Sequence, residues 1–218
     1  MKKILILILM GLAAAAQPVA AQAGRDGFNL WNSTHVFYPL TDKLQFDFGN
    51  KDQYSPWNSR LDYYFLDLTA YQKISSHFSV GLGVRRTHSY QSTGWKPGNT
   101  ILVYGVWFLN PGSVKIKLAN RVTAKVYKNS ETIYGLDNIT NVDFFTHSTR
   151  KFPKPYLMDE IFSDLNAGRI QTVRIYGGFR LLKFRHFGFD IFYCYWKSNS
   201  AGNWKEFNVL GMNTKFYI

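Results

Sequence analysis

Residues 114–126 read Val-Lys-Ile-Lys-Leu-Ala-Asn-Arg-Val-Thr-Ala-Lys-Val, and apolar and polar side chains alternate along most of this stretch. Such alternation predicts a β-strand, because successive side chains leave a strand on opposite faces. At about 3.3 Å per residue these thirteen residues reach roughly 40 Å, whereas strands of globular proteins usually have about five or six residues. One face is apolar except at Asn120, and the other is cationic. This combination is typical of a wall between lipid and water, as in a transmembrane β-barrel.

Ten further segments have strand-like patterns, and no segment of the mature chain predicts a convincing helix. They are Phe28–Tyr38, Lys43–Gly49, Arg60–Ile74, Val80–Tyr90, Thr100–Leu109, Leu136–Phe145, Tyr156–Asp164, Arg169–Leu181, Phe187–Trp196 and Phe207–Ile218. The longer polar stretches between them, at 50–58, 92–99 and 198–203, are expected to be loops. The order predicts an all-β, up-and-down antiparallel transmembrane β-barrel of about 10–12 strands. Because bacterial barrels of this kind have even strand numbers, we expect ten or twelve rather than eleven.

The N-terminus has the pattern of an export signal. Lys2 and Lys3 precede the apolar segment Ile4–Ala16, and Ala21-Gln22-Ala23 is a small-residue cleavage site. We therefore expect residues 1–23 to be a signal peptide and residues 24–218 to form one barrel domain. Cys194 is the single cysteine, which excludes an intrachain disulfide, so stability must come from closure of the sheet or from packing.

The charge balance indicates anionic partners. The chain has 26 Lys and Arg against 14 Asp and Glu, and removal of Lys2 and Lys3 leaves a formal net charge of +10. In an exported protein this balance points to lipid phosphates, lipopolysaccharide or an anionic solute. No nucleic-acid-binding motif is present, so we expect no nucleic acid partner. Aromatic residues make up 17% of the chain, which fits aromatic girdles around a membrane barrel.

Several short segments, in this order and spacing, resemble an uncharacterised bacterial outer-membrane family known as domain of unknown function 2490. They are Ser59–Tyr63, Tyr71–Gly83, Asn120–Val122, Lys154–Glu160 and Asn208–Gly211. The resemblance spans nearly the whole mature chain. It implies a β-barrel of the outer membrane, common in Gram-negative lineages, and it brings no established activity. The last strand ends with an aromatic residue near the C-terminus, as outer-membrane barrels typically do for recognition by the barrel-insertion machinery.

The basic face of residues 114–126 is the main candidate site. If the apolar face meets lipid, the basic side chains line the lumen, since Lys or Arg at the membrane midplane costs about 2–4 kcal/mol. Seven residues form this predicted luminal basic cluster: Lys115, Lys117, Arg121, Lys125, Arg174, Arg180 and Arg85. Two interpretations remain open. The lumen attracts anionic solutes or lipid headgroups, or it is plugged by salt bridges to the candidate luminal acids Asp47, Asp67, Asp159 or Glu160. Asp159 and Glu160 are adjacent and point to opposite faces, so only one of them can face the lumen. A barrel of this size leaves little room beyond its side chains.

Two other classes of function remain as alternatives. In a lipid-modifying barrel enzyme, His77 and Ser79 have the two-residue spacing of a base and a nucleophile, although no orienting partner is evident. The other His/Ser pairs, His88-Ser89 and His147-Ser148, are adjacent and point to opposite faces. We therefore expect no catalytic residues, and no metal site or cofactor is expected. The second alternative is a soluble periplasmic barrel that binds an apolar ligand, with the apolar face of 114–126 inside and the lysines outside.

Overall fold

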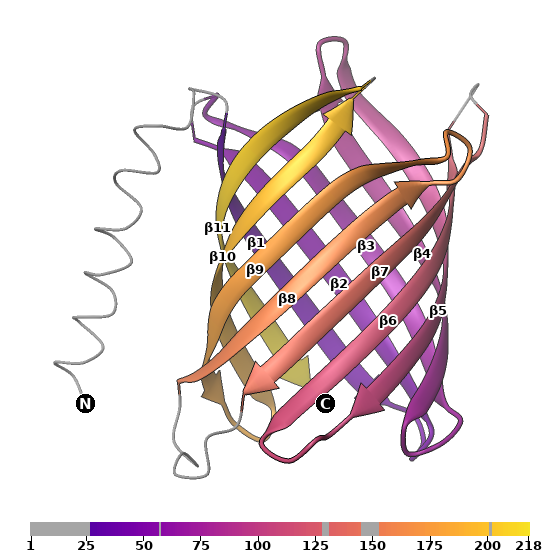
Figure 1. The fold of residues 1–218 in the computed structure, drawn as a ribbon, viewed down its shortest axis with the longest axis vertical. Helices are drawn as coiled ribbons and strands as arrows, with labels where there is room; N and C mark the ends of the chain where they lie inside the picture. Colours follow the sequence, from indigo (N-terminus) through magenta and orange to yellow (C-terminus); the bar gives the residue numbers. More distant parts are fainter. Residues whose placement is uncertain (1–26, 57, 128–130, 145–152, 201) are drawn as a thin grey trace, which may run out of the picture.

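The computed structural model describes residues 27–56, 58–127, 131–144, 153–200 and 202–218. Eleven strands form the regular structure of this part of the chain (Figure 1). They are β1 (Phe28–Pro39), β2 (Leu44–Ser55), β3 (Arg60–Lys73), β4 (Phe78–Gln91), β5 (Gly94–Leu109), β6 (Val114–Val126), β7 (Ile133–Phe144), β8 (Lys154–Asp164), β9 (Arg169–Lys183), β10 (Phe187–Ser200) and β11 (Asn203–Tyr217). Within these ranges no helix has the length and hydropathy needed to cross a membrane. The predicted signal peptide lies outside the described residues.

The strands close into a barrel in which each strand pairs antiparallel with the next along the chain. The closing pair is different: β1 and β11 are parallel, in register from Phe28↔Asn208 to Phe37↔Tyr217. Closure leaves no strand edge unpaired. The predicted all-β barrel of about 10–12 strands is therefore confirmed, with eleven strands among the described residues. Only the expectations of an even number and of a wholly antiparallel sheet are wrong. In an up-and-down sheet with an odd number of strands, the first and last strands run in the same direction and can close only in parallel.

The strands are longer than the sequence patterns suggested. Many residues that were expected to form loops belong to strands. β2 extends to Ser55, β5 begins at Gly94, and β10 and β11 continue into the stretch 198–203. Pro97 and Gly98 weaken the local strand signal, but β5 pairs with β4 along its length, from Gln91↔Gly94 to Phe78↔Trp107. Gly94 has a φ of 106°, a conformation that favours glycine and permits the two-residue turn between β4 and β5.

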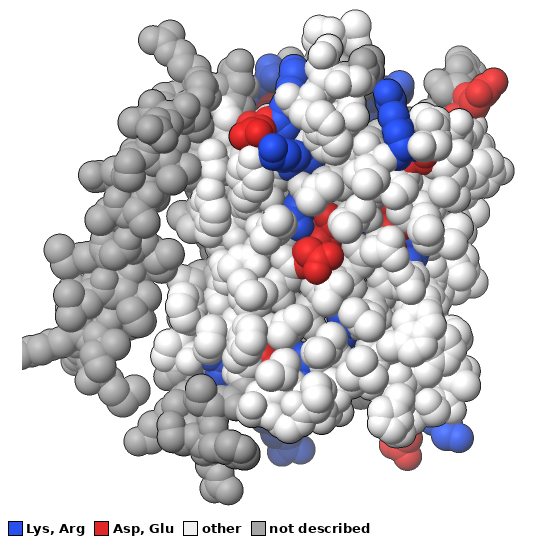
Figure 2. Space-filling model, viewed as in Figure 1, with Lys and Arg blue, Asp and Glu red and all other residues white. Residues whose placement is uncertain are grey.

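The outer wall of the barrel is apolar and its interior is charged. Leu82 and Val122 are 63% and 48% exposed on the outside, whereas the inward-facing Arg121 and Asp137 are 7% and 2% exposed. Figure 2 shows one side of this wall: Lys and Arg gather toward the two ends, and an acidic group interrupts the wall near mid-height. This polarity is the reverse of that of a soluble barrel.

Aromatic and aliphatic side chains fill part of the interior. One buried cluster comprises Trp31, Tyr156, Tyr176, Phe192, Cys194 and Val209, and a second comprises Leu102, Tyr104, Val106 and Ala119. The thiol of Cys194 is enclosed in the first cluster. The first cluster comes from β1 and β8–β11 and the second from β5 and β6, so aromatic and aliphatic side chains enter the lumen from more than one side.

Candidate functional site

The lumen contains two cavities. The larger, of about 1200 Å³, reaches the turns at the end of the barrel where β11 finishes, and residues 40–43 of the β1–β2 turn line it. We call this the C-terminal end. The smaller, of about 310 Å³, lies toward the opposite end, beside Tyr127. The two cavities share five lining residues, which therefore lie between them: Lys51, Phe65, Arg85, Arg121 and Glu160.

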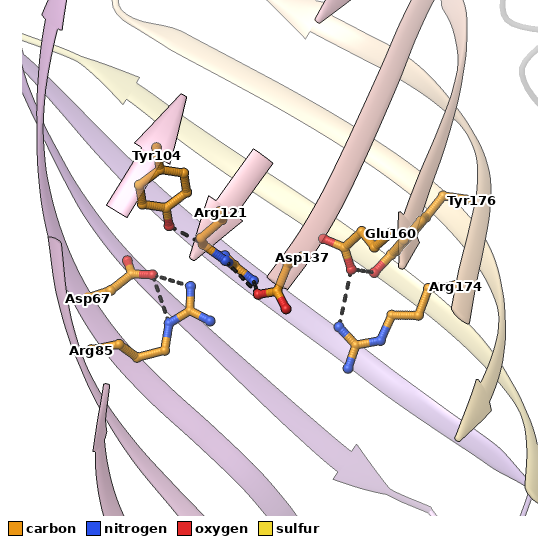
Figure 3. Close-up of polar contacts among 8 residues, drawn as sticks. All are labelled: Asp67, Arg85, Tyr104, Arg121, Asp137, Glu160, Arg174 and Tyr176. Atoms are coloured by element: carbon orange, nitrogen blue, oxygen red, sulfur yellow. Dashed lines mark hydrogen bonds and ion pairs between the residues drawn. The ribbon is translucent and has the colours of Figure 1, made fainter. Parts of the chain in front are cut away.

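These five residues, together with the residues that form hydrogen bonds or ion pairs with them, form a belt around the lumen that we call the waist. Its members are Lys51, Phe65, Asp67, Arg85, Tyr104, Arg121, Asp137, Glu160, Arg174 and Tyr176. Figure 3 shows eight of them converging from neighbouring strands on the middle of the lumen. The waist thus lies between the two cavities of the lumen.

Two of the ion pairs of the waist lie on β3–β4 and β6–β7. The Arg85 guanidinium donates to Asp67 Oδ2 through Nη2 at 2.6 Å and Nε at 3.1 Å. Arg121 donates to Asp137 Oδ2 through Nε and Nη2, both at 2.8 Å, and its Nη1 donates to the Tyr104 hydroxyl at 3.3 Å (Figure 3). In each pair a single carboxylate oxygen, Oδ2, accepts both contacts from the guanidinium group.

The third pair lies on β8 and β9. Arg174 Nη1 donates to Glu160 Oε2 at 3.1 Å, and the Tyr176 hydroxyl donates to the same oxygen at 2.6 Å. All three acid–arginine pairs are directly opposite each other in the sheet register, where side chains on adjacent strands are about 4.5–5.5 Å apart at Cβ. The register therefore sets each charge against its partner.

Aromatic rings enclose the cations of the waist. Lys51 Nζ is 3.5 Å from the centroid of the Trp31 ring, and the Arg85 guanidinium carbon is 3.8 Å from that of Phe65. The Arg174 guanidinium lies among the rings of Trp31, Phe162 and Trp196, at 4.7–5.0 Å. Cation–π contacts of this kind stabilise a partly desolvated cation without an anion. Ion pairs and rings together fill the waist, which favours the plugged interpretation of the lumen at this level.

The larger cavity has an excess of positive charge. Among the described residues that line it, eleven are Lys or Arg and six are Asp or Glu. Arg180 forms ion pairs with two of these acids: its Nη2 lies 2.5 Å from Asp143 Oδ1 and its Nη1 lies 2.8 Å from Asp190 Oδ2. Lys215 Nζ also lies 2.5 Å from Asp190 Oδ2. Lys115 and Lys117 have no hydrogen bond or ion pair with any described residue.

The structure places the predicted basic cluster on the inside. Arg85, Arg121, Lys115, Lys117 and Arg180 line the larger cavity, and Lys125 and Arg174 line the smaller. Three of the predicted acids, Asp47, Asp67 and Glu160, also line the larger cavity, where Asp47 Oδ1 is 2.9 Å from His35 Nδ1.

Of the adjacent acids Asp159 and Glu160, Glu160 lines both cavities and Asp159 lines neither. Its neighbours Met158 and Glu160 line the larger cavity, and successive strand residues alternate faces, so Asp159 cannot point inward with Glu160. It lies on the outer wall, in register with Thr140 of β7 and Ile175 of β9.

Sequence reasoning missed several charged residues of the lumen. They are Lys51, Asp137, Asp143, Asp190 and Lys215. Asp137 and Asp143 share one parity of β7, and this signal alone could have assigned them to the face opposite the apolar side chains. Asp190 and Lys215 come from strands whose polar faces carry few charges, so their role becomes visible only when the barrel closes.

The His/Ser pairs do not form a nucleophile–base pair in the part of the chain that is described. His77 Nδ1 lies 2.7 Å from the Ser76 hydroxyl, Ser79 lines the larger cavity, and no hydrogen bond joins His77 to Ser79. His88 stacks on Tyr64, with ring centroids 4.5 Å apart. The pair His147-Ser148 lies outside the described residues.

Ser33 and His35 have the same two-residue spacing, which the sequence reading overlooked. The Ser33 hydroxyl, however, donates to Asn213 Oδ1 instead of to His35. The described residues also contain no group of three or more His, Cys, Asp or Glu positioned to hold a metal ion.

A closed all-β barrel with an apolar outer wall and a charged, constricted interior defines the class of this protein. Residues 28–207 match the family described as protein of unknown function (DUF2490), and the chain belongs to this family. No curated protein matches the chain. The match over residues 28–207 confirms the membership of this family that the short segments predicted.

Proposed function

We propose that this protein is an integral β-barrel of the bacterial outer membrane whose basic lumen is a narrow, anion-attracting conduit, constricted at the waist. The observation that carries the proposal is the reversed polarity of the wall, with large apolar side chains outside and paired charges inside. Water exposure of such a wall would be unfavourable, whereas a hydrocarbon environment stabilises it. The proposal assigns no enzymatic chemistry to the barrel.

The dimensions of the strands and the positions of the aromatic residues support a membrane location. The strands have 11–16 residues, against about 9–11 needed for a tilted strand to cross a bilayer. Exposed aromatic side chains occur near strand ends, including Tyr38 and Trp107 at the C-terminal end and Tyr90 and Trp95 at the other. Tyr and Trp concentrate at membrane–water interfaces, because their rings are apolar and their polar atoms remain hydrated.

Cell fractionation tests the membrane location directly. We expect the protein in the outer-membrane fraction, resistant to salt and urea washes and released by detergent. Recovery in the wash without detergent would favour a soluble periplasmic barrel instead. Lipid profiles of cells that produce the Ser79→Ala variant should match the wild type, and a difference would support the lipid-modifying enzyme.

The neighbours Asp159 and Glu160 provide a matched test of which face meets lipid. In a bilayer we expect Asp159→Leu to raise the free energy of unfolding by about 1–2 kcal/mol, because a carboxylate on the lipid-facing wall is unfavourable. Glu160→Leu should lower it by about 3 kcal/mol, because Arg174 and Tyr176 lose their shared acceptor. Urea unfolding in lipid vesicles, followed by tryptophan fluorescence, measures both. Destabilisation by both substitutions would contradict the assignment of the outer wall to lipid.

A further inference from the structure

The larger cavity contains a group of basic side chains that the waist does not use. They are Lys115 and Lys117 on β6, Arg180 on β9 and Lys215 on β11, and all four line the cavity. We call them the vestibule cluster. The charge of Lys117 is attracted by Asp47 and repelled by Lys215, Lys115 and Arg180. Four like charges therefore face one space.

The contacts of Arg180 connect the members of the vestibule cluster. Arg180 reaches past β8 to β7, where Nη2 lies 3.3 Å from Asn141 Oδ1 and 2.5 Å from Asp143 Oδ1. Asn141 and Asp143 are the register partners of Lys117 and Lys115. On its other side Arg180 shares Asp190 with Lys215. The four cations thus form a continuous arc along the wall of the cavity.

The carboxylates of this arc do not neutralise it. Asp143 forms an ion pair with Arg180, and Asp190 forms ion pairs with both Arg180 and Lys215. Lys115 faces Asp143 in the register and yet forms no ion pair with it or with any other described residue. Asp47 also lines the cavity and attracts Lys117, but it is paired with His35, so neither Lys115 nor Lys117 has an ion-paired carboxylate among the described residues. The cavity beside them is about 1200 Å³, large enough for a solute. Such an arrangement is stabilised by a bound anion with at least two negative charges.

We propose that the vestibule cluster is a binding site for a phosphate-bearing anion, with Lys115 and Lys117 as its principal contacts. Lysine ammonium groups donate to phosphate oxygens from several directions, and charge-assisted bonds of this kind are the stronger hydrogen bonds of proteins. Tyr156 and Tyr217 also line the cavity and add two hydroxyl groups beside the cluster. The inference deepens the proposed function, because it names the class of anion that the lumen takes.

Pyrophosphate titration of the purified barrel tests the site. The barrel is placed in lipid discs of phosphatidylcholine, which supply no anionic headgroup. At low salt, calorimetry should detect binding of inorganic pyrophosphate and should detect no binding of acetate. Lys115→Gln/Lys117→Gln should weaken binding at least about tenfold, since charge-assisted contacts are lost. The control Lys197→Gln/Lys205→Gln removes the same charge outside both cavities and should bind as the wild type does. Equal affinity of the two double variants would overturn the site, and no binding by the wild type would exclude a free solute and leave a lipid headgroup as the phosphate-bearing ligand.

A second experiment identifies the source of the phosphate. The barrel is reconstituted in lipid discs that contain phosphatidic acid and is then washed, and the amount of phosphatidic acid that stays bound to the protein is measured. Retention that depends on Lys115 and Lys117 supports a lipid headgroup, and pyrophosphate binding without such retention supports a free solute. Absence of both overturns the proposal. Neither experiment measures conduction. A barrel that binds pyrophosphate but passes no ions would therefore contradict the proposed conduit and leave the anion-binding site supported.

Discussion

Arg121→Leu should lower the free energy of unfolding by about 3–5 kcal/mol, since removing one partner of a buried ion pair leaves the other charge uncompensated. Asp137 is almost fully buried, and the two guanidinium contacts at 2.8 Å are its hydrogen bonds among the described residues. The Tyr104 hydroxyl would lose the Arg121 Nη1 donor as well. Urea unfolding in lipid vesicles gives the change in free energy.

The double variant Arg121→Leu/Asp137→Leu separates loss of the pair from loss of packing. Replacement of a whole buried pair by apolar side chains of similar volume is often neutral or stabilising, so the double variant should recover most of the loss. Lys197→Ala removes one partner of the exposed Lys197–Glu206 pair and should leave stability nearly unchanged. Equal losses in the single and double variants would show that packing of the arginine, and not its charge, stabilises the waist.

The fold could be predicted closely from the sequence because alternation is a local property. β6 has the bounds Val114–Val126 that its pattern predicts, and all eleven candidate segments correspond to strands. Closure is not local. Whether the first and last strands pair parallel or antiparallel depends on their number, and the general preference for even numbers led to the wrong choice. The turns at Gly94 and Gly202 are so short that polar strand ends were interpreted as loops.

The face of each basic residue could be predicted from parity, but its partner could not. Arg121 meets Asp137, and Arg174 meets Glu160, only because the turns set a particular register between neighbouring strands. A shift of one residue would turn one member of each pair outward. Asp159 shows the same limit: its charge suggested a luminal acid, yet Glu160 occupies the inward position. The partner of Arg180 is harder still to predict, because Arg180 on β9 forms an ion pair with Asp143 on β7, two strands away.

Opening of the waist should increase ion conduction through the barrel several-fold. Glu160→Ser/Arg174→Ser removes both members of one pair, so no uncompensated charge of that pair remains, and small polar side chains replace long ones. Glu160 borders both cavities, and Arg174 lies on the smaller. The substitutions should therefore connect the two cavities by a wetted path. Planar-bilayer recordings measure the single-channel conductance, and Lys197→Ser/Glu206→Ser, an exposed pair outside both cavities, is the matched control.

The reversal potential of the opened barrel under a salt gradient tests the origin of its selectivity. The excess of basic residues along the larger cavity should make the Glu160→Ser/Arg174→Ser variant anion-selective. Adding Lys115→Glu/Lys117→Glu changes the formal charge of that cavity by four units and should shift the preference toward cations. If conductance rises but selectivity does not respond to Lys115 and Lys117, the ions follow a path that avoids the vestibule cluster. If conductance does not rise at all, the aromatic cluster around Trp31 and Tyr176 blocks the lumen independently of the charges, and the barrel is a closed structural element of its membrane.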